Sequence, residues 1–197
     1  MNLANKLTIS RIVMTIIILL ILLIPFEEFG FSVPTFYVMG KVLVDIRYLV
    51  AGFLFVIACV TDYLDGTVAR KEKMTSDFGA TLDAIADKIL VNGVLIILAY
   101  QGFISIIIPV IIVLRDICVD ALRVLAAKNK VIIKASKWGK IKTVFMMCGV
   151  SLLLFYNLPF EIWGIYIADL FVFVATILSV ISAILYFIHV KDKLKFD

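Results

Sequence analysis

Long apolar stretches separated by short polar ones run along the whole chain, and they predict helices that cross a membrane. A hydrocarbon core about 30 Å thick needs about 20 mostly apolar residues in a helix, whereas a barrel strand needs only about ten alternating ones. The stretches here are of the longer kind, so they favour a helical bundle. They predict one domain (residues 1–197) with six spans, at residues 8–26, 46–69, 81–100, 104–125, 141–158 and 164–189.

The chain before the first span has a mixed pattern. The segment "MNLANKLTISR" alternates polar residues with Leu3, Leu7 and Ile9, which predicts either a short interfacial N-terminal segment or a plain cytoplasmic anchor. The apolar run that follows is succeeded by "EEFG" and a proline rather than by a small-residue cleavage site. We therefore interpret the run as a retained span and not as a signal peptide.

Composition supports an integral membrane protein. Of the 197 residues, 63% are hydrophobic and 17% are charged, and the mean hydropathy is +1.13. A soluble domain of this length has a much more polar surface, so the composition excludes that class. The single cysteines Cys59, Cys118 and Cys148 lie in different apolar runs, which predicts neither a disulfide framework nor a thiolate metal site.

The distribution of lysine and arginine predicts the orientation of the spans. Only Lys41 and Arg47 lie near one set of span ends, and most of the other basic residues flank the opposite set. Because cytoplasmic ends carry the excess of positive charge, we expect both termini to be cytoplasmic. The flanking basic residues are Lys6, Arg11, Arg70, Lys71, Lys73, Lys128, Lys130, Lys134, Lys137, Lys140, Lys142, Lys191, Lys193 and Lys195.

One segment places carboxylates at helical spacing between apolar stretches. In "TDYLDGTVARKEKMTSDFGATLDAIAD", Asp62 and Asp65 share one helix face, and Asp83 and Asp87 share a face of the next helix. Neighbouring carboxylates in an apolar setting repel each other unless cations compensate their charge. Oxygen ligands without histidine or cysteine favour magnesium, with manganese or calcium as alternatives. The pattern therefore predicts a divalent metal site.

Two alternatives remain for these aspartates. They would form a structural network with the nearby cations Arg70, Lys71, Lys73 and Lys88, or they would relay ions or protons in a small transporter. Intramembrane carboxylates usually mark functional sites, which disfavours the first alternative. The relay leaves the glycines and the later basic cluster unexplained.

The same segment reads D-x-x-D-G-x-x-A-R, eight residues, then G-x-x-x-D-x-x-x-D, and in this it resembles the CDP-alcohol phosphatidyltransferase family. The resemblance implies transfer of a phosphatidyl group from a CDP-linked lipid to an alcohol, with release of CMP. It also implies two Mg²⁺ ions, with Mn²⁺ as an alternative, and a homodimer. It implies contact with membrane lipids and no nucleic-acid partner.

The resemblance assigns roles within the segment. Asp62, Asp65 and Asp83 would hold the metals, and Asp87 would complete the site and act as the base for the acceptor hydroxyl. The nucleotide and CDP-lipid would be bound by Thr8, Arg11, Asp62, Gly66, Ala69, Arg70 and Gly79, the small residues making room and Arg70 adding positive charge near the phosphates.

A second polar region follows in the fourth span and at the start of the fifth. Embedded arginines need an anionic partner, so Arg115 and Arg123 would pair either with Asp116 and Asp120 or with a substrate phosphate. We predict that Arg115, Arg123, Lys137, Lys140 and Lys142 bind the phosphate of the acceptor.

The acceptor is suggested by this region. Arg115–Asp116, Leu122–Arg123 and the run Gly139-Lys140-x-Lys142-Thr143 resemble the phosphatidylglycerophosphate synthase branch of the family, which implies CDP-diacylglycerol and sn-glycerol 3-phosphate as substrates. Asp116 stands where that branch usually has glutamate, and Ala4 where it commonly has proline. The alternatives are inositol phosphate, phosphatidylglycerol and serine.

Overall fold

The structure is a computed structural model that describes the backbone of residues 3–72, 77–129 and 137–194. Side chains are described for residues 9–62, 85–129 and 138–193. Within these residues the chain is mostly helical, as predicted. The helices are α1 (Leu3–Leu23), α2 (Ile46–Glu72), α3 (Asp77–Tyr100), α4 (Ile107–Lys128), α5 (Lys137–Leu154) and α6 (Ile167–Leu194).

Each predicted span coincides with one of these helices, but the ends differ by up to five residues. The polar turns at several helix ends were too hydrophilic to be counted as parts of a span, although they continue the helical hydrogen bonding. The N-terminal segment forms the first turns of α1, and its place at the membrane interface stays a prediction. It is not a separate element, because α1 already begins at Leu3 and has no proline or glycine to interrupt it.

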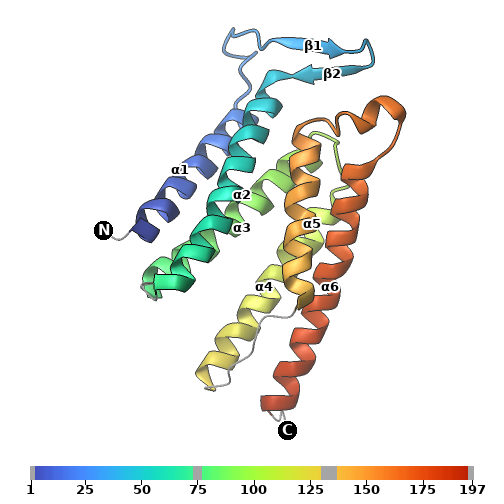
Figure 1. Ribbon diagram of the computed structural model, residues 1–197. Coiled ribbons are helices and arrows are strands. Elements are labelled where there is room, and N and C mark those ends of the chain that lie inside the picture. Colours follow the sequence, from blue (N-terminus) through green and yellow to red (C-terminus); the bar gives the residue numbers. More distant parts are fainter. Residues whose placement is uncertain (1–2, 73–76, 130–136, 195–197) are drawn as a thin grey trace.

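The connection between α1 and α2 contains a β-hairpin that the hydropathy pattern did not predict. Strands β1 (Thr35–Val38) and β2 (Val42–Asp45) pair antiparallel, with Val38 opposite Val42. Met39 and Gly40, at the turn, have φ angles of 49° and 67°, and the left-handed region is the one that tight hairpin turns require. The hairpin lies across one end of the bundle, here called the hairpin end, and α6 finishes at the opposite, C-terminal end (Figure 1).

The helices form two groups that meet along the middle of the molecule (Figure 1). α1 packs against α2 and α3, α6 packs against α4 and α5, and the contacts of α2 with α5 and of α3 with α4 and α5 join the groups. The buried core contains Phe55, Leu95, Ile112 and Val150. Gly149 brings α5 close to α6, since a Cβ added there would lie 2.7 Å from Cγ2 of Val172.

At the hairpin end a buried asparagine shapes the connection between α5 and α6. Asn157 is 4% exposed, and its Nδ2 donates to Oε2 of Glu161 at 3.0 Å and to the carbonyl of Ile165 at 2.7 Å. Its Oδ1 accepts the N–H of Ala168 at 3.1 Å. Asn157 therefore satisfies backbone groups that the start of α6 would otherwise leave unpaired.

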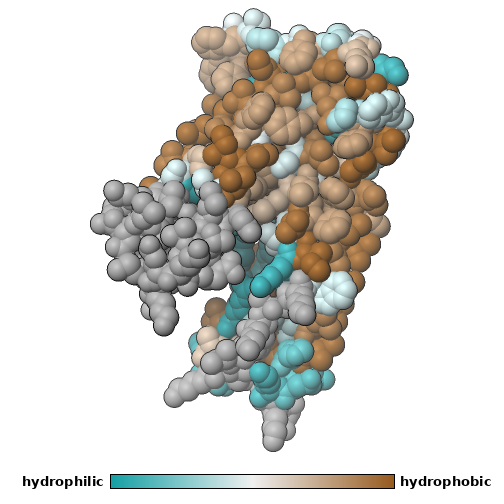
Figure 2. Space-filling view, viewed as in Figure 1, coloured by the Kyte–Doolittle hydropathy of each residue, from teal (hydrophilic) through white to brown (hydrophobic). Residues whose placement is uncertain are grey.

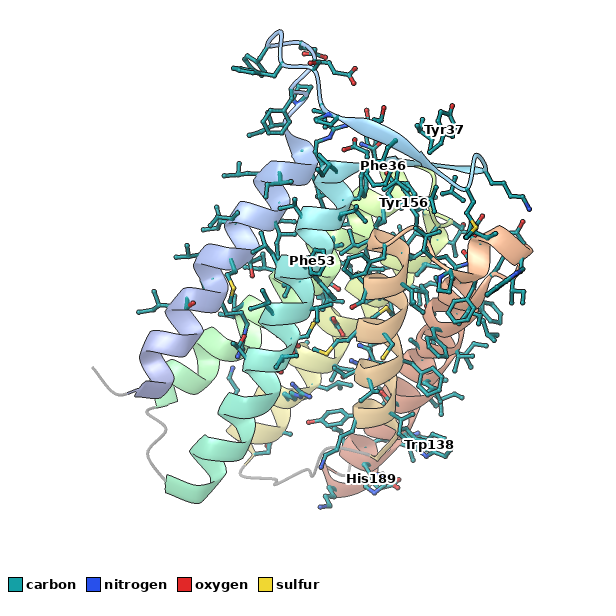
Figure 3. All side chains as sticks on the ribbon, turned by 45° about the horizontal axis from the view of Figure 1, so that its top comes forward. Phe36, Tyr37, Phe53, Trp138, Tyr156 and His189 are labelled. Atoms are coloured by element: carbon teal, nitrogen blue, oxygen red, sulfur yellow. The ribbon has the colours of Figure 1, made fainter. Side chains whose placement is uncertain are left out.

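Aromatic rings beneath the hairpin close this end of the bundle. Tyr156, labelled in Figure 3, lies 5.6 Å from Tyr48 and 5.4 Å from Phe103 between ring centroids. Its hydroxyl accepts the N–H of Asp45 at 3.1 Å, which ties β2 to the bundle. Asp169, in the first turn of α6, is placed where a carboxylate interacts favourably with the helix dipole.

Large apolar side chains cover the outside of the bundle as well as its core. Phe53, Leu114 and Phe173 are each more than half exposed, and Figure 2 shows a broad apolar band over the visible face. Within the described residues, Ile167–Lys193 is a helix long and apolar enough to cross a membrane, and Ile9–Leu23 is a shorter apolar helix. The number and orientation of the other spans stay predictions.

Candidate functional site

The four aspartates of the motif lie on two helices that follow each other in the chain. Asp62 and Asp65 are on the second half of α2, and Asp83 and Asp87 are on the first half of α3. The side chains of Asp62 and Asp87 are described. Those of the remaining predicted donor-site residues lie outside the described side chains, namely Thr8, Asp65, Gly66, Ala69, Arg70, Gly79 and Asp83.

Asp62 is contacted by an arginine from the first helix. Nη1 of Arg11 lies 2.8 Å from Oδ1 of Asp62, and the Arg11 side chain is only 1% exposed. The carbonyl of Arg11 also accepts the hydroxyl of Thr15 at 2.8 Å. The structure thus places Arg11, predicted to bind the CDP-lipid, directly against a predicted metal ligand.

Asp87 lies on a cavity that also contains most of the predicted acceptor residues. The cavity has a volume of about 310 Å³, and α3, α4, α5 and α6 all contribute to its wall. Figure 2 shows hydrophilic residues around a hollow toward the C-terminal end. The lining residues are Asp87, Lys88, Arg115, Asp116, Val119, Asp120, Arg123, Gly139, Lys140, Lys142, Thr143, Ser182 and Tyr186.

Four of the five predicted acceptor cations are therefore brought together. Arg115 and Arg123 come from α4, and Lys140 and Lys142 come from the first turns of α5. The side chain of Lys137 lies outside the described ones. Lys140 and Lys142, which lie more than 50 positions after Asp87 in the sequence, thus border the same space as Asp87.

A buried carboxylate, Asp116, lies at the base of this cavity. It is 9% exposed and accepts hydrogen bonds from Nη1 of Arg115 at 2.9 Å and from Nζ of Lys142 at 3.4 Å. Nδ2 of Asn92, on α3, also donates to it at 3.4 Å. The carboxylate of Asp116, on α4, is therefore hydrogen-bonded to side chains of α3 and α5 as well as of α4.

Arg115 extends this network to α6. Its Nε donates to the carbonyl of Ser179 at 3.1 Å, and its Nη2 donates to the hydroxyl of Ser182. Each guanidinium nitrogen thus bonds to another group of the protein. Of the two partners considered for Arg115, the structure shows the neighbouring aspartate.

Arg123 and Lys88 share a second carboxylate. Nη1 of Arg123 lies 3.8 Å from Oδ1 of Asp120, and Lys88 forms an ion pair with Oδ2 of the same residue. Arg123 is 54% exposed and its guanidinium lies 6.0 Å from the centre of the Tyr186 ring. It is held less firmly than Arg115, and its charge faces the outer part of the cavity.

Sequence analysis missed several residues of this wall. Asn92 contributes a polar group from α3, and Ser182 and Tyr186 contribute them from α6. Ser179, Ser182 and Tyr186 recur three and four residues apart in an otherwise apolar helix. That spacing places them on one face, and it was a signal that α6 borders a polar site.

The donor chemistry suits a hard divalent cation. Among the side chains that the structure describes, no three histidine, cysteine or acidic residues are grouped closely enough to hold a metal. Asp65 and Asp83 fall outside that set, and carboxylates alone are ligands that suit magnesium.

The arrangement combines two capabilities. One side offers carboxylates near a buried arginine, and the other offers a cavity of about 310 Å³ with lysine and arginine side chains. Ammonium and guanidinium groups in a half-buried cavity form strong charge-assisted hydrogen bonds with phosphate. The site is suited to a phosphorylated molecule held next to Asp87.

Comparisons with known proteins agree with this chemistry. A family model for CDP-alcohol phosphatidyltransferase matches residues 1–188. The chain is 37% identical, over 194 residues, to the CDP-diacylglycerol–glycerol-3-phosphate 3-phosphatidyltransferase of Bacillus subtilis (strain 168), an alignment that covers 98% of this chain and 97% of that protein.

Proteins of the same name from other bacteria are also similar. That of Haemophilus influenzae is 36% identical over 179 residues, which are 88% of this chain and 90% of that protein. That of Mycoplasma pneumoniae is 39% identical over 151 residues, which are 76% of this chain and 66% of that protein. With a family model and relatives that match nearly its whole length, the chain belongs to the CDP-alcohol phosphatidyltransferase family.

Proposed function

We infer that the protein transfers the phosphatidyl group of CDP-diacylglycerol to sn-glycerol 3-phosphate, giving phosphatidylglycerol phosphate and CMP. The relatives that match it over most of their length carry the name of this activity. The observation that carries the inference within the molecule is the cavity that joins Asp87 to Arg123, Lys140 and Lys142. A neutral acceptor such as serine gives no reason for so many cations around one space.

The transfer step uses the side chains on both sides of the cavity. The free primary hydroxyl of glycerol 3-phosphate attacks the phosphorus that carries diacylglycerol, and the bond from that phosphorus to the CMP oxygen breaks. Asp87 accepts the hydroxyl proton, and CMP leaves with the electron pair. The cations of the cavity hold the acceptor phosphate, so that the hydroxyl is oriented toward the donor.

We further propose that Asp62, Asp65, Asp83 and Asp87 hold two Mg²⁺ ions, for which Mn²⁺ can substitute. Held by these carboxylates, such ions would supply positive charge to offset that of the pyrophosphate and of the leaving CMP. The oxygen-only donor set supports this assignment. Arg11, 2.8 Å from Asp62, adds a fixed positive charge on the donor side, and the small residues Gly66, Ala69 and Gly79 leave room there for the nucleotide.

For the whole molecule we propose a multi-pass enzyme with six spans and both termini in the cytoplasm. The excess of lysine and arginine at the C-terminal end of the bundle supports this orientation, and it puts the cavity on the side where a water-soluble glycerol phosphate is available. Association as a homodimer is proposed from the family resemblance.

The test is a transfer assay with purified protein, CDP-diacylglycerol and magnesium. We expect CMP release with glycerol 3-phosphate, and much slower release with inositol phosphate, phosphatidylglycerol or serine. Lys142→Ala should raise the KM for glycerol 3-phosphate, and Arg115→Ala should raise it by disturbing the cavity wall. A preference for serine, or kinetics with glycerol 3-phosphate that ignore both substitutions, would contradict the assigned acceptor.

The same assay separates the enzyme from a protein of another class. An ion or proton transporter built on the four aspartates would release no CMP from CDP-diacylglycerol with any acceptor. Absence of CMP release from folded protein supplied with magnesium would therefore overturn the proposed activity altogether.

A further inference from the structure

Asp116 and Lys142 form a contact at the point where two cavities meet. Besides the cavity of about 310 Å³, a smaller one of about 40 Å³ lies deeper between α3, α4 and α5. Asp87, Asp116 and Lys142 line both cavities. The contact between Asp116 and Lys142 therefore forms part of the floor of the space in which acceptor and base must meet.

Lys142 and Arg115 are held differently by the carboxylate. Each nitrogen of Arg115 bonds to a protein group, so that Arg115 fixes Asp116 against α6. An ammonium has three N–H donors, and among the described residues Asp116 is the one that accepts from Lys142, at 3.4 Å. Lys142 is thus oriented by Asp116, while donors remain for a ligand in the cavity.

The charges of the network still favour an anion. Arg115 and Lys142 are two cations around the single carboxylate of Asp116, so the trio keeps one net positive charge. Over the whole lining, the five cations Lys88, Arg115, Arg123, Lys140 and Lys142 exceed the three carboxylates Asp87, Asp116 and Asp120 by two charges. The net positive charge of the lining attracts a phosphate. The Asp116 carboxylate does not reverse this attraction, and its effect is to orient the ammonium group of Lys142.

We propose that Asp116 is a positioning residue for the acceptor, acting through Lys142. A free lysine side chain loses considerable conformational entropy when a ligand fixes it. Asp116, anchored to α6 through Arg115 and to α3 through Asn92, holds the ammonium in the cavity before the acceptor arrives. This inference rests on the proposed function, because it assigns Asp116 to the acceptor phosphate of that reaction.

The experiment is a double-mutant cycle on the purified enzyme, with KM measured for each substrate. Asp116→Asn should raise the KM for glycerol 3-phosphate roughly tenfold, because a hydrogen bond to a charged group is lost, and leave the KM for CDP-diacylglycerol within about twofold. In a Lys142→Met background the same substitution should change the acceptor KM by less than about twofold, since its target is already absent. Asp116→Glu keeps the charge and should restore most of the acceptor affinity.

The matched control is Asp192→Asn. Asp192 is an exposed carboxylate near the C-terminal end of α6, outside the cavity lining, and its loss should leave both KM values unchanged. The positioning role would be overturned if the two substitutions raised the acceptor KM independently, so that their fold-changes multiplied in the double variant. It would also be overturned if Asp116→Asn raised the KM for CDP-diacylglycerol as much as the KM for glycerol 3-phosphate. Neither result affects the proposed function, which the wild-type transfer assay decides.

Folding is checked by thermal unfolding in detergent. Should Asp116→Asn fail to give folded protein, the cycle is measured with Asp116→Ser, which also removes the carboxylate but keeps a small polar group. A change in acceptor KM that vanishes in the Lys142→Met background supports the proposal. A change that persists there, or no change in the acceptor KM, refutes it.

Discussion

Gly149 offers a direct test of how closely α5 and α6 must pack. A Cβ at this position would lie 2.7 Å from Cγ2 of Val172, 3.0 Å from the backbone nitrogen of Val172 and 3.2 Å from Cβ of Phe171. Rotation of the valine relieves only the first contact, because a backbone nitrogen cannot turn aside. Gly149→Ala must therefore move the two helices apart.

The cost can be estimated from the size of the clash. Overpacking of a well-filled contact typically destabilises a protein by about 1–3 kcal/mol, and we expect the upper part of this range because backbone atoms are involved. The gain in helix propensity from glycine to alanine offsets less than about 1 kcal/mol of it. For a chain of this size each lost kcal/mol corresponds to a melting temperature lower by about 2–4 °C.

The consequence for activity follows from the position of the contact. Lys142 lies seven residues before Gly149 on α5, about 10 Å along the helix, and Ser179 and Ser182 lie farther along α6 in the direction of the cavity. Separation at Gly149 therefore widens the space between two of the cavity walls. We expect the KM for glycerol 3-phosphate to rise more than the KM for CDP-diacylglycerol.

The matched control is Gly93→Ala in α3. A Cβ there would meet the side chain of Leu19, the nearest atom being Cδ2 at 2.8 Å, and the end of a leucine can rotate away. We expect a change in stability near zero. Equal melting temperatures for Gly149→Ala and Gly93→Ala in detergent would show that the close approach of α5 and α6 does not limit stability.

Three further predictions concern the aspartates and the hairpin end. Replacing Asp62, Asp65 or Asp83 with asparagine should nearly abolish transfer without unfolding the protein, and EDTA should do the same to the wild type; full turnover in EDTA would refute the metal assignment. Asp87→Asn should abolish transfer but retain much of the CDP-diacylglycerol affinity, measured by equilibrium binding, whereas parallel loss of both would make Asp87 chiefly a metal ligand. Asn157→Ala removes three hydrogen bonds and should lower the free energy of unfolding by about 2–4 kcal/mol, seen as a lower melting temperature, while acceptor KM values stay unchanged because the residue lies far from the cavity.

The helices could be predicted because each contains a long apolar stretch, which the hydropathy pattern detects whether the side chains face the core or the outside of the bundle. The β-hairpin could not be predicted in this way, since Thr35–Val38 and Val42–Asp45 are short and lie in a stretch that we interpreted only as a connection. A local signal was present in the pair Met39-Gly40 between two runs rich in β-branched residues. Hydropathy alone predicts a loop for this stretch, because it does not detect the residue types that form a hairpin turn.

The candidate site was predicted unevenly for a similar reason. Spacing within one helix identified Asp87 as part of an acidic face, and the concentration of basic residues near the span ends identified Arg115, Arg123, Lys140 and Lys142. Spacing does not say which helices meet. The packed helices show that each nitrogen of the Arg115 guanidinium bonds to a protein group. From the sequence alone, this structural role of Arg115 could not be distinguished from binding of a phosphate.

The bonds from Arg115 to Ser179 and Ser182 bear on the order in which the enzyme is synthesised. Translation proceeds from the N-terminus, so the aspartate motif of α2 and α3 is synthesised well before α6, the last of the described helices. A nascent chain that carries the motif but lacks α6 lacks the two α6 partners of Arg115 and one wall of the acceptor cavity. We therefore expect a chain that ends before α6 to be inactive toward glycerol 3-phosphate.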